Sequence, residues 1–90
     1  MNDQEKIEYV DLFDDITQLE QTGKNGENFF VSKIGDKFIP MVQLKEGEDL
    51  FGISWIQNLY ENPNVIVSNC AWPSEFGAKE VIKVYARNAK

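Results

Sequence analysis

The sequence contains no histidine. Histidine is the side chain most often used as a general base and as a metal ligand, and its absence also removes the Ser-His and Cys-His nucleophile pairs. Cys70 is the only cysteine, so the chain can form no internal disulfide and has no second thiol with which to hold a metal. We therefore expect no catalytic residues, no metal site and no cofactor, and we do not expect an enzyme.

Long apolar runs are also missing, and none approaches the length that crosses a membrane. The first five residues are polar and acidic, unlike the basic start of a signal peptide. A single unpaired cysteine is typical of a reducing compartment. These features predict a cytoplasmic protein without a membrane partner.

Positive charge is scarce, and the net charge of the chain is −6. Residues 1–20 hold seven acidic residues against Lys6 alone, whereas the other seventy residues balance eight acids with eight bases. Binding to nucleic acid needs clustered lysine and arginine to neutralise phosphates, so we do not expect a nucleic-acid partner. A protein partner with a basic surface fits this charge better.

Apolar residues recur at helical spacing near the N-terminus, and they predict an amphipathic helix over residues 4–21. A short strand over residues 7–10 followed by a helix from Asp14 is the alternative. On the longer helix, acidic residues form one stripe, which is either a solvated face or a docking surface for a basic partner. The members of this stripe are Glu5, Glu8, Asp11 and Asp15.

Two apolar runs flank Gly35 and Asp36, and this pattern predicts a β-hairpin over residues 28–44. A turn centred there places Lys33 opposite Phe38, Val31 opposite Pro40 and Phe29 opposite Val42. Both faces of this hairpin are apolar, so the ribbon is either covered on both sides or is itself an adhesive surface.

Pro40 falls within the second strand of this hairpin. Proline has no backbone donor, which predicts that the strand is bulged there or lies at an edge of the sheet. An edge next to Ile39 and Met41 would be adhesive unless paired, so extension of the sheet in a homodimer is an alternative to the monomer.

The second half of the chain is expected to alternate between short elements. Ser54 and Gln57 resemble a capping box, and Val65 to Cys70 form a β-branched run. The predicted elements are a strand over 50–53, a helix over 55–61, a buried strand over 65–70, a loop over 71–77 and a half-buried strand over 79–87. The loop carries two aromatic residues, Trp72 and Phe76, which either fold back onto the core or make contacts with a partner.

The sequence therefore predicts a single α+β domain over residues 1–90. An N-terminal amphipathic helix and a short second helix are expected to pack, mainly on one face, against a four- to five-stranded, mainly antiparallel sheet.

The leading functional hypothesis is a small acidic protein-interaction domain without catalytic activity. Inhibitors and antagonists are often small, acidic and single-domain, so such a role is one form of this hypothesis. The alternative is an assembly subunit that oligomerises through the edge of the 28–44 hairpin, and a third hypothesis is a ligand-binding domain with a pocket near Cys70 and Trp72. The partner-binding residues predicted by the leading hypothesis are Glu5, Glu8, Asp11, Asp15, Trp72 and Phe76.

Overall fold

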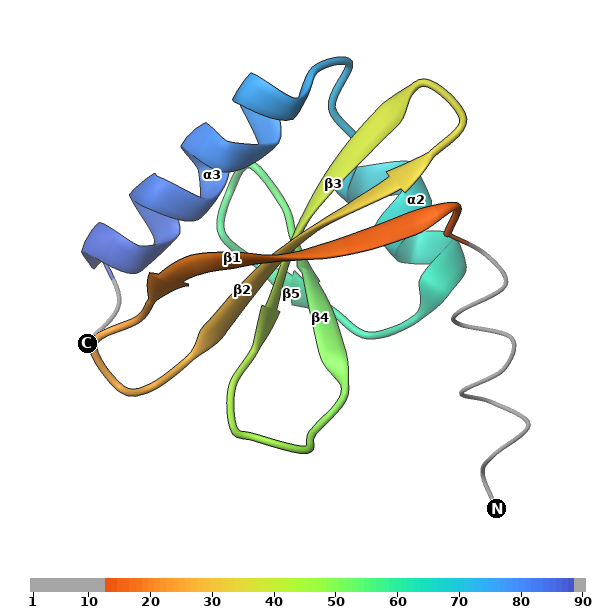
Figure 1. Cartoon of the computed structure of the whole chain (residues 1–90). Coiled ribbons are helices and arrows are strands. Elements are labelled where there is room, and N and C mark those ends of the chain that lie inside the picture. The colour runs from red at the N-terminus through yellow and green to blue at the C-terminus, as the bar shows by residue number, and fades with distance from the viewer. Residues whose placement is uncertain (1–12, 89–90) are drawn as a thin grey trace.

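The computed structural model describes residues 13–88, which form a five-stranded antiparallel sheet followed by two helices (Figure 1). The strands lie side by side in chain order, so the sheet is a simple meander. The α+β class is confirmed, but the predicted helices are wrong. The elements are β1 (Asp15–Thr22), β2 (Asn28–Ile34), β3 (Lys37–Gln43), β4 (Leu50–Ile53), β5 (Leu59–Tyr60), α2 (Pro63–Cys70) and α3 (Glu75–Asn88).

The β2–β3 hairpin is confirmed with the predicted register, because Lys33 lies opposite Phe38 and Phe29 lies opposite Val42. Gly35 has a positive φ of 58° in the turn, a conformation that glycine adopts without steric cost. Because successive side chains in a strand point to opposite faces, the hairpin presents one apolar row to each side of the sheet.

The two helices cover opposite faces of the sheet (Figure 1). The expectation that the helices lie mainly on one face is therefore wrong, and the reason is the apolar character of both hairpin faces, each of which needs a cover. The buried cluster on the α3 face contains Phe29, Val31, Val42, Ile53, Ala78, Val81 and Ile82. The buried cluster on the α2 face contains Phe13, Ile39, Met41, Ile66 and Cys70.

The predicted N-terminal helix over residues 4–21 is not supported, and neither is the alternative helix from Asp14. Residues 15–22 form strand β1, and residues 1–12 lie outside the described part of the chain. The backbone N–H of Asp14 donates to the carbonyl of Lys33 over 2.7 Å, next to the Asp15–Lys33 pair of the ladder. The free side of β2 thus offers this segment a row of backbone partners, and local helical spacing does not outweigh them.

The predicted strand over 65–70 is also wrong, because these residues belong to helix α2. The Asn62 side-chain oxygen accepts hydrogen bonds from the backbone N–H groups of Asn64 and Val65, at 2.9 and 3.3 Å. Pro63 occupies the first turn, where its missing donor costs nothing. The Asn-Pro pair therefore begins a helix, and it does not end the one predicted over residues 55–61, which form a turn and strand β5 instead.

Residues 79–87, predicted to be a strand, lie within helix α3. The Ser74 hydroxyl accepts from the backbone N–H of Gly77 over 3.1 Å and caps the helix start. The sheet-facing residues of α3 follow helical spacing, and they are Ala78, Val81, Ile82, Tyr85 and Ala86. Within residues 13–88, no helix is long and apolar enough to cross a membrane.

The connection between α2 and α3 closes part of the sheet edge. Trp72 and Phe38 exchange two backbone hydrogen bonds of 2.7 Å, which form an isolated antiparallel bridge. Of the β3 residues, only Met41–Gln43 pair with β4. Pro40 therefore lies between the Phe38–Trp72 bridge and the start of the β3–β4 ladder. The prediction that this strand is bulged at Pro40 or lies at an edge of the sheet is wrong, because β3 is the central strand and pairs with β2 through Pro40 without a break. Proline is tolerated there because β4 does not reach Pro40, so no strand partner needs its missing donor on that side.

Helix α2 approaches the sheet closely at Gly52. A β-carbon built on Gly52 would lie 2.8 Å from Cγ2 of Ile66 and 3.1 Å from the sulfur of Cys70. Only glycine leaves enough room for α2 at this point of β4.

Candidate functional site: a groove between helix α3 and the β4–β5 turn

The turn between β4 and β5 is held by a small hydrogen-bond network around Ser54. The backbone N–H of Ser54 donates to the Asn58 carbonyl, and the N–H of Gln57 donates to the Ser54 carbonyl, at 3.0 and 2.9 Å. The buried Ser54 hydroxyl accepts from the Asn58 N–H over 3.1 Å. Gln57 has a φ of 67°, a left-handed conformation that is costly for a residue with a side chain. This network gives the turn a defined shape.

Large apolar side chains are exposed at the tip of this turn and at the start of α3. Among the described residues, Trp55 is 72% exposed, Ile56 is 51% exposed and Phe76 is 72% exposed. Covering a side chain of this size with a partner contributes about 1.5–3 kcal/mol. Exposed aromatic residues that a rigid turn holds out of the core are typical of binding surfaces.

A groove of about 320 Å³ lies between this turn and α3. Both tryptophans of the chain line it, and Phe76 is the neighbour of one of its lining residues on α3. We call it the Trp55 groove, and its lining residues are Trp55, Gln57, Trp72, Gly77, Glu80, Val81 and Val84.

Trp72 is the fixed wall of the Trp55 groove. Its backbone is held by the two hydrogen bonds to Phe38, and its side chain is only partly exposed. A β-carbon on Gly77 would lie 3.1 Å from Cε3 of the Trp72 ring, so the ring lies directly against the first turn of α3. Trp55, on the opposite turn, is by contrast largely free of contacts with its own chain.

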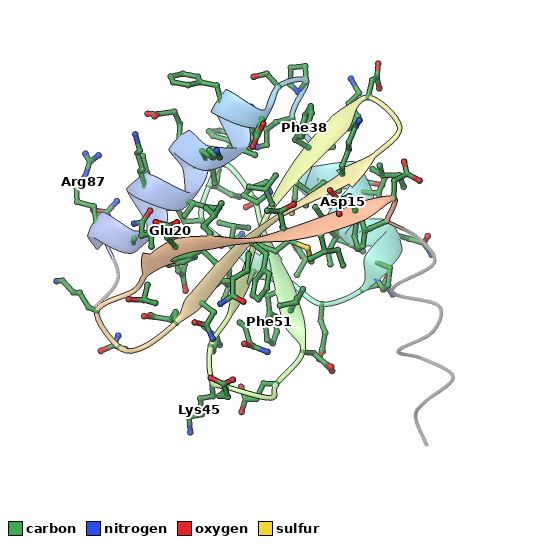
Figure 2. The ribbon with its side chains drawn as sticks, in the orientation of Figure 1. Asp15, Glu20, Phe38, Lys45, Phe51 and Arg87 are labelled. Carbon is green, nitrogen blue, oxygen red and sulfur yellow. The ribbon has the colours of Figure 1, made fainter. Side chains whose placement is uncertain are left out.

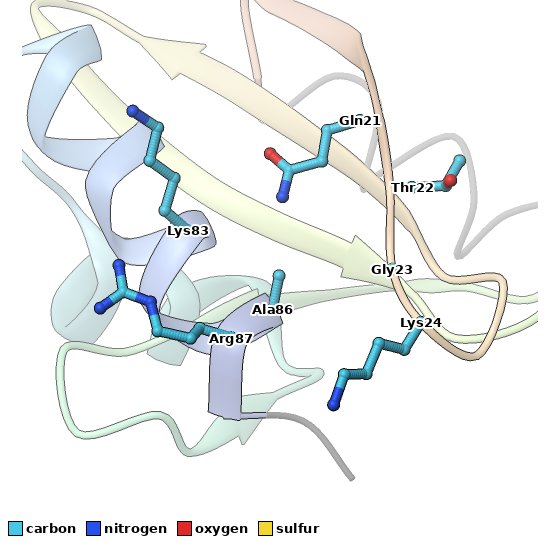
Figure 3. A pocket seen from close by; sticks show the side chains of 7 residues that line it. All are labelled: Gln21, Thr22, Gly23, Lys24, Lys83, Ala86 and Arg87. Atoms are coloured by element: carbon cyan, nitrogen blue, oxygen red, sulfur yellow. The ribbon is translucent and has the colours of Figure 1, made fainter.

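A second hollow, of about 380 Å³, lies where the end of β1 approaches the last turns of α3 (Figure 3). Lys24, Lys83 and Arg87 line it, but the Lys83 ammonium lies 3.3 Å from the carboxylate of Glu80. In Figure 3, Gln21 and Lys24 extend toward α3, whereas Lys83 and Arg87 extend away from them. Because the three cations do not converge on one point, we assign no anion site there.

The predicted acidic stripe falls largely outside the described part of the chain. Glu5, Glu8 and Asp11 lie outside the described residues, and Asp15 is an exposed residue of strand β1 (Figure 2). The stripe required helical spacing through Asp15, and residues of a strand alternate between two faces instead.

The two predicted aromatic contacts have different environments. Trp72 is partly buried in a groove wall, and Phe76 is exposed on α3 rather than in a loop. Trp55 was not among the predicted partner-binding residues, because residues 55–61 were expected to form a helix and not an exposed turn. The short distance in sequence between β4 and the Asn62-Pro63 pair could have indicated a tight turn there, since connections between neighbouring strands are usually short.

Cys70 and Trp72 do not share a pocket. Cys70 is fully buried in the cluster beneath α2, whereas Trp72 packs against the cluster beneath α3, on the other face of the sheet. Burial raises the pKa of the Cys70 thiol to about 11, so the thiol is protonated and shielded. Within residues 13–88, no three histidine, cysteine or acidic side chains come together in a way that could hold a metal ion.

Comparisons of this chain with protein-family models, with curated protein sequences and with solved structures find no match. The function is therefore inferred from the side chains themselves. The Trp55 groove combines exposed apolar area, a hydrogen-bonded frame and a concave shape.

Proposed function

We propose that this protein is a non-catalytic interaction module that binds a partner protein through the Trp55 groove and the exposed side chains next to it. The observation that carries this proposal is the exposure of Trp55, which lines the groove, together with that of Ile56 and Phe76, which are chain neighbours of lining residues. A cytoplasmic location and a partner with a basic surface belong to the same proposal, on the grounds of the single cysteine and the net charge of −6.

The energetics of the turn support this proposal. The left-handed Gln57 works against the stability of the isolated chain, and the exposed Trp55, Ile56 and Phe76 gain little apolar burial from folding. Binding would bury these apolar side chains, and tryptophan residues in desolvated pockets supply much of the energy of protein interfaces. The rigid turn also lowers the entropy lost when Trp55 becomes ordered against a partner.

A phage-displayed library of random peptides tests the proposal. The library is selected in parallel against the wild-type protein and against the double variant Trp55→Ala/Phe76→Ala. We expect the wild type to enrich a family of related peptides that the double variant does not enrich. Their affinities, measured by fluorescence, should fall at least about tenfold in the double variant.

The matched control is Lys37→Ala/Lys45→Ala, which alters two exposed side chains outside the groove. Because Trp55 and Phe76 are both 72% exposed, the double variant should keep the unfolding free energy of the wild type within about 0.5 kcal/mol per substitution. Equal enrichment of the same peptides on the folded double variant would refute the proposal.

The assembly alternative has less support. The 28–44 hairpin lies inside the sheet, with β1 on one side and with β4 and the Trp72 bridge on the other. Ile39 and Met41, the residues expected at an adhesive edge, are fully buried.

A further inference from the structure

We infer that the Trp55 groove recognises a long basic side chain of the partner, with arginine preferred. This inference rests on the proposed function and names the residue type that the groove selects. The residues that line the groove include both tryptophans together with Gln57 and Glu80. An arginine side chain has an apolar stem, a flat cationic head and several donors, so it can engage all of these groups at once.

The two tryptophans provide the first part of this complementarity. The face of an indole ring carries negative potential and attracts a cation, and arginine makes this contact more often than lysine does. Trp72 is held in place by its backbone bridge to Phe38, whereas Trp55 stands on the opposite turn and is exposed. A guanidinium group can therefore stack on a fixed ring while a second ring covers its stem.

Glu80 provides the second part. It lines the groove from α3, its side chain is 44% exposed, and its carboxylate lies 3.3 Å from the ammonium of Lys83. An exposed pair of this kind, three residues apart on a helix, contributes little to stability. An incoming guanidinium can replace Lys83 and form two parallel hydrogen bonds with the carboxylate, which an ammonium cannot do.

Glu80 and Gln57 are the lining residues that can distinguish an arginine from a purely apolar occupant. Both kinds of occupant could contact the tryptophan and valine side chains of the groove, but an apolar chain would give neither polar residue a new partner. The net charge of −6 favours the approach of a basic segment over that of an acidic one.

The test uses intrinsic fluorescence, because both tryptophans of the chain line the groove and all of its tryptophan emission reports on this site. The full chain is titrated at constant ionic strength with the N-acetyl amides of arginine, lysine, citrulline and norleucine. Citrulline matches arginine in length and planarity but has no charge, and norleucine supplies an apolar chain alone. We expect saturable changes with arginine, weaker ones with lysine, and none of comparable affinity with the two neutral probes.

Two single variants isolate the role of Glu80. Glu80→Gln should weaken arginine binding about two- to fivefold. Glu75→Gln is the matched control, because Glu75 lies on the same helix and pairs with Lys79 in a similar way but does not line the groove. Citrulline or norleucine binding as tightly as arginine, or equal effects of the two variants, would overturn the inference.

The two proposals fail separately. If the peptides that depend on Trp55 and Phe76 contain aliphatic anchors and no arginine, the groove is still an interaction site and only the arginine preference is wrong. If no peptide distinguishes the wild type from the double variant, the proposed function itself is wrong.

Discussion

Cys70 shows how one buried residue responds to its surroundings. Cys70 is the last residue of α2, its thiol lies close to Gly52 of β4, and the residue is fully buried. Removing a thiolate from water disfavours the charged form, which is why the pKa of Cys70 rises to about 11 from an ordinary value of 9.0. The folded chain therefore holds this proton more tightly than the unfolded chain does.

This difference predicts a loss of stability in alkali. The contribution of the protonated thiol is complete below about pH 9, and it is lost as the pH rises toward 11, by at most about 3 kcal/mol. The free energy of unfolding is measured in urea across this range for the wild type and for Cys70→Ala. The difference between the unfolding free energies of the wild type and of Cys70→Ala should become smaller as the pH rises.

The wild type is compared with Cys70→Ala because the pKa of Tyr85 is also raised, by burial and by the nearby charge of Glu27. Tyr85 is present in both proteins, so its titration largely cancels from the difference. A gap between the curves that stays constant with pH would show that Cys70 is accessible to water in the folded state.

At the scale of an element, the β4–β5 turn combines stabilising hydrogen bonds with an unfavourable backbone conformation at Gln57. Hydrogen bonds to Ser54 hold residues 54–58 in a closed shape that requires a positive φ at Gln57. A non-glycine residue in this conformation costs about 1–2 kcal/mol. The chain tolerates this cost at the point where Trp55 and Ile56 are displayed, which is typical of functional turns.

Replacement of Gln57 by glycine is expected to raise the free energy of unfolding by about 0.5–1 kcal/mol, because glycine adopts a positive φ without strain. Urea unfolding measures this change. Gln18→Gly is the matched control, since Gln18 is an exposed residue in strand β1, where glycine should lower stability. A loss of stability in Gln57→Gly as large as that in Gln18→Gly would mean that the turn is not left-handed at Gln57 in solution.

At the scale of the whole molecule, one sheet serves two cores. Each apolar row of the β2–β3 hairpin is covered by a different helix, and the chain passes from α2 to α3 around the sheet edge at Trp72. Figure 1 shows the twisted sheet between the two helices. The hairpin is thus a shared centre of the fold and not a free edge.

Met41→Lys tests this arrangement. Met41 is fully buried beneath α2, and an unpaired ammonium there should destabilise the fold so strongly that cooperative unfolding is lost. Circular dichroism in urea and light scattering make the measurement. Gln18→Lys places the same charge at an exposed position on the same face of the sheet, opposite Phe30, and should leave the fold intact.

A different result would favour the assembly alternative. If Met41→Lys remains folded while an oligomer of the wild type dissociates, Met41 lies at an interface between chains and not in a core beneath α2. The protein would then be an assembly subunit that associates through the 28–44 hairpin.

The sequence by itself determined the hairpin over residues 28–44, its turn at Gly35 and its register. These features depend on a local turn and on alternation along two adjacent strands, so neighbouring residues carry all of the information. The short strand at residues 50–53 was predictable for the same reason. Of the candidate site, the sequence indicated that Trp72 and Phe76 were aromatic residues without an obvious place in the core.

Only the tertiary structure decided whether the remaining segments form helices or strands. Residues 65–70 have strand propensity but form a helix. The Asn62 cap begins α2, and this helix buries the apolar side chains of the hairpin that include Ile39 and Met41. Residues 15–22 have helical spacing but form a strand, because β2 offers unpaired backbone groups. The Trp55 groove likewise exists only because a turn and a helix distant in sequence meet above the same face of the sheet.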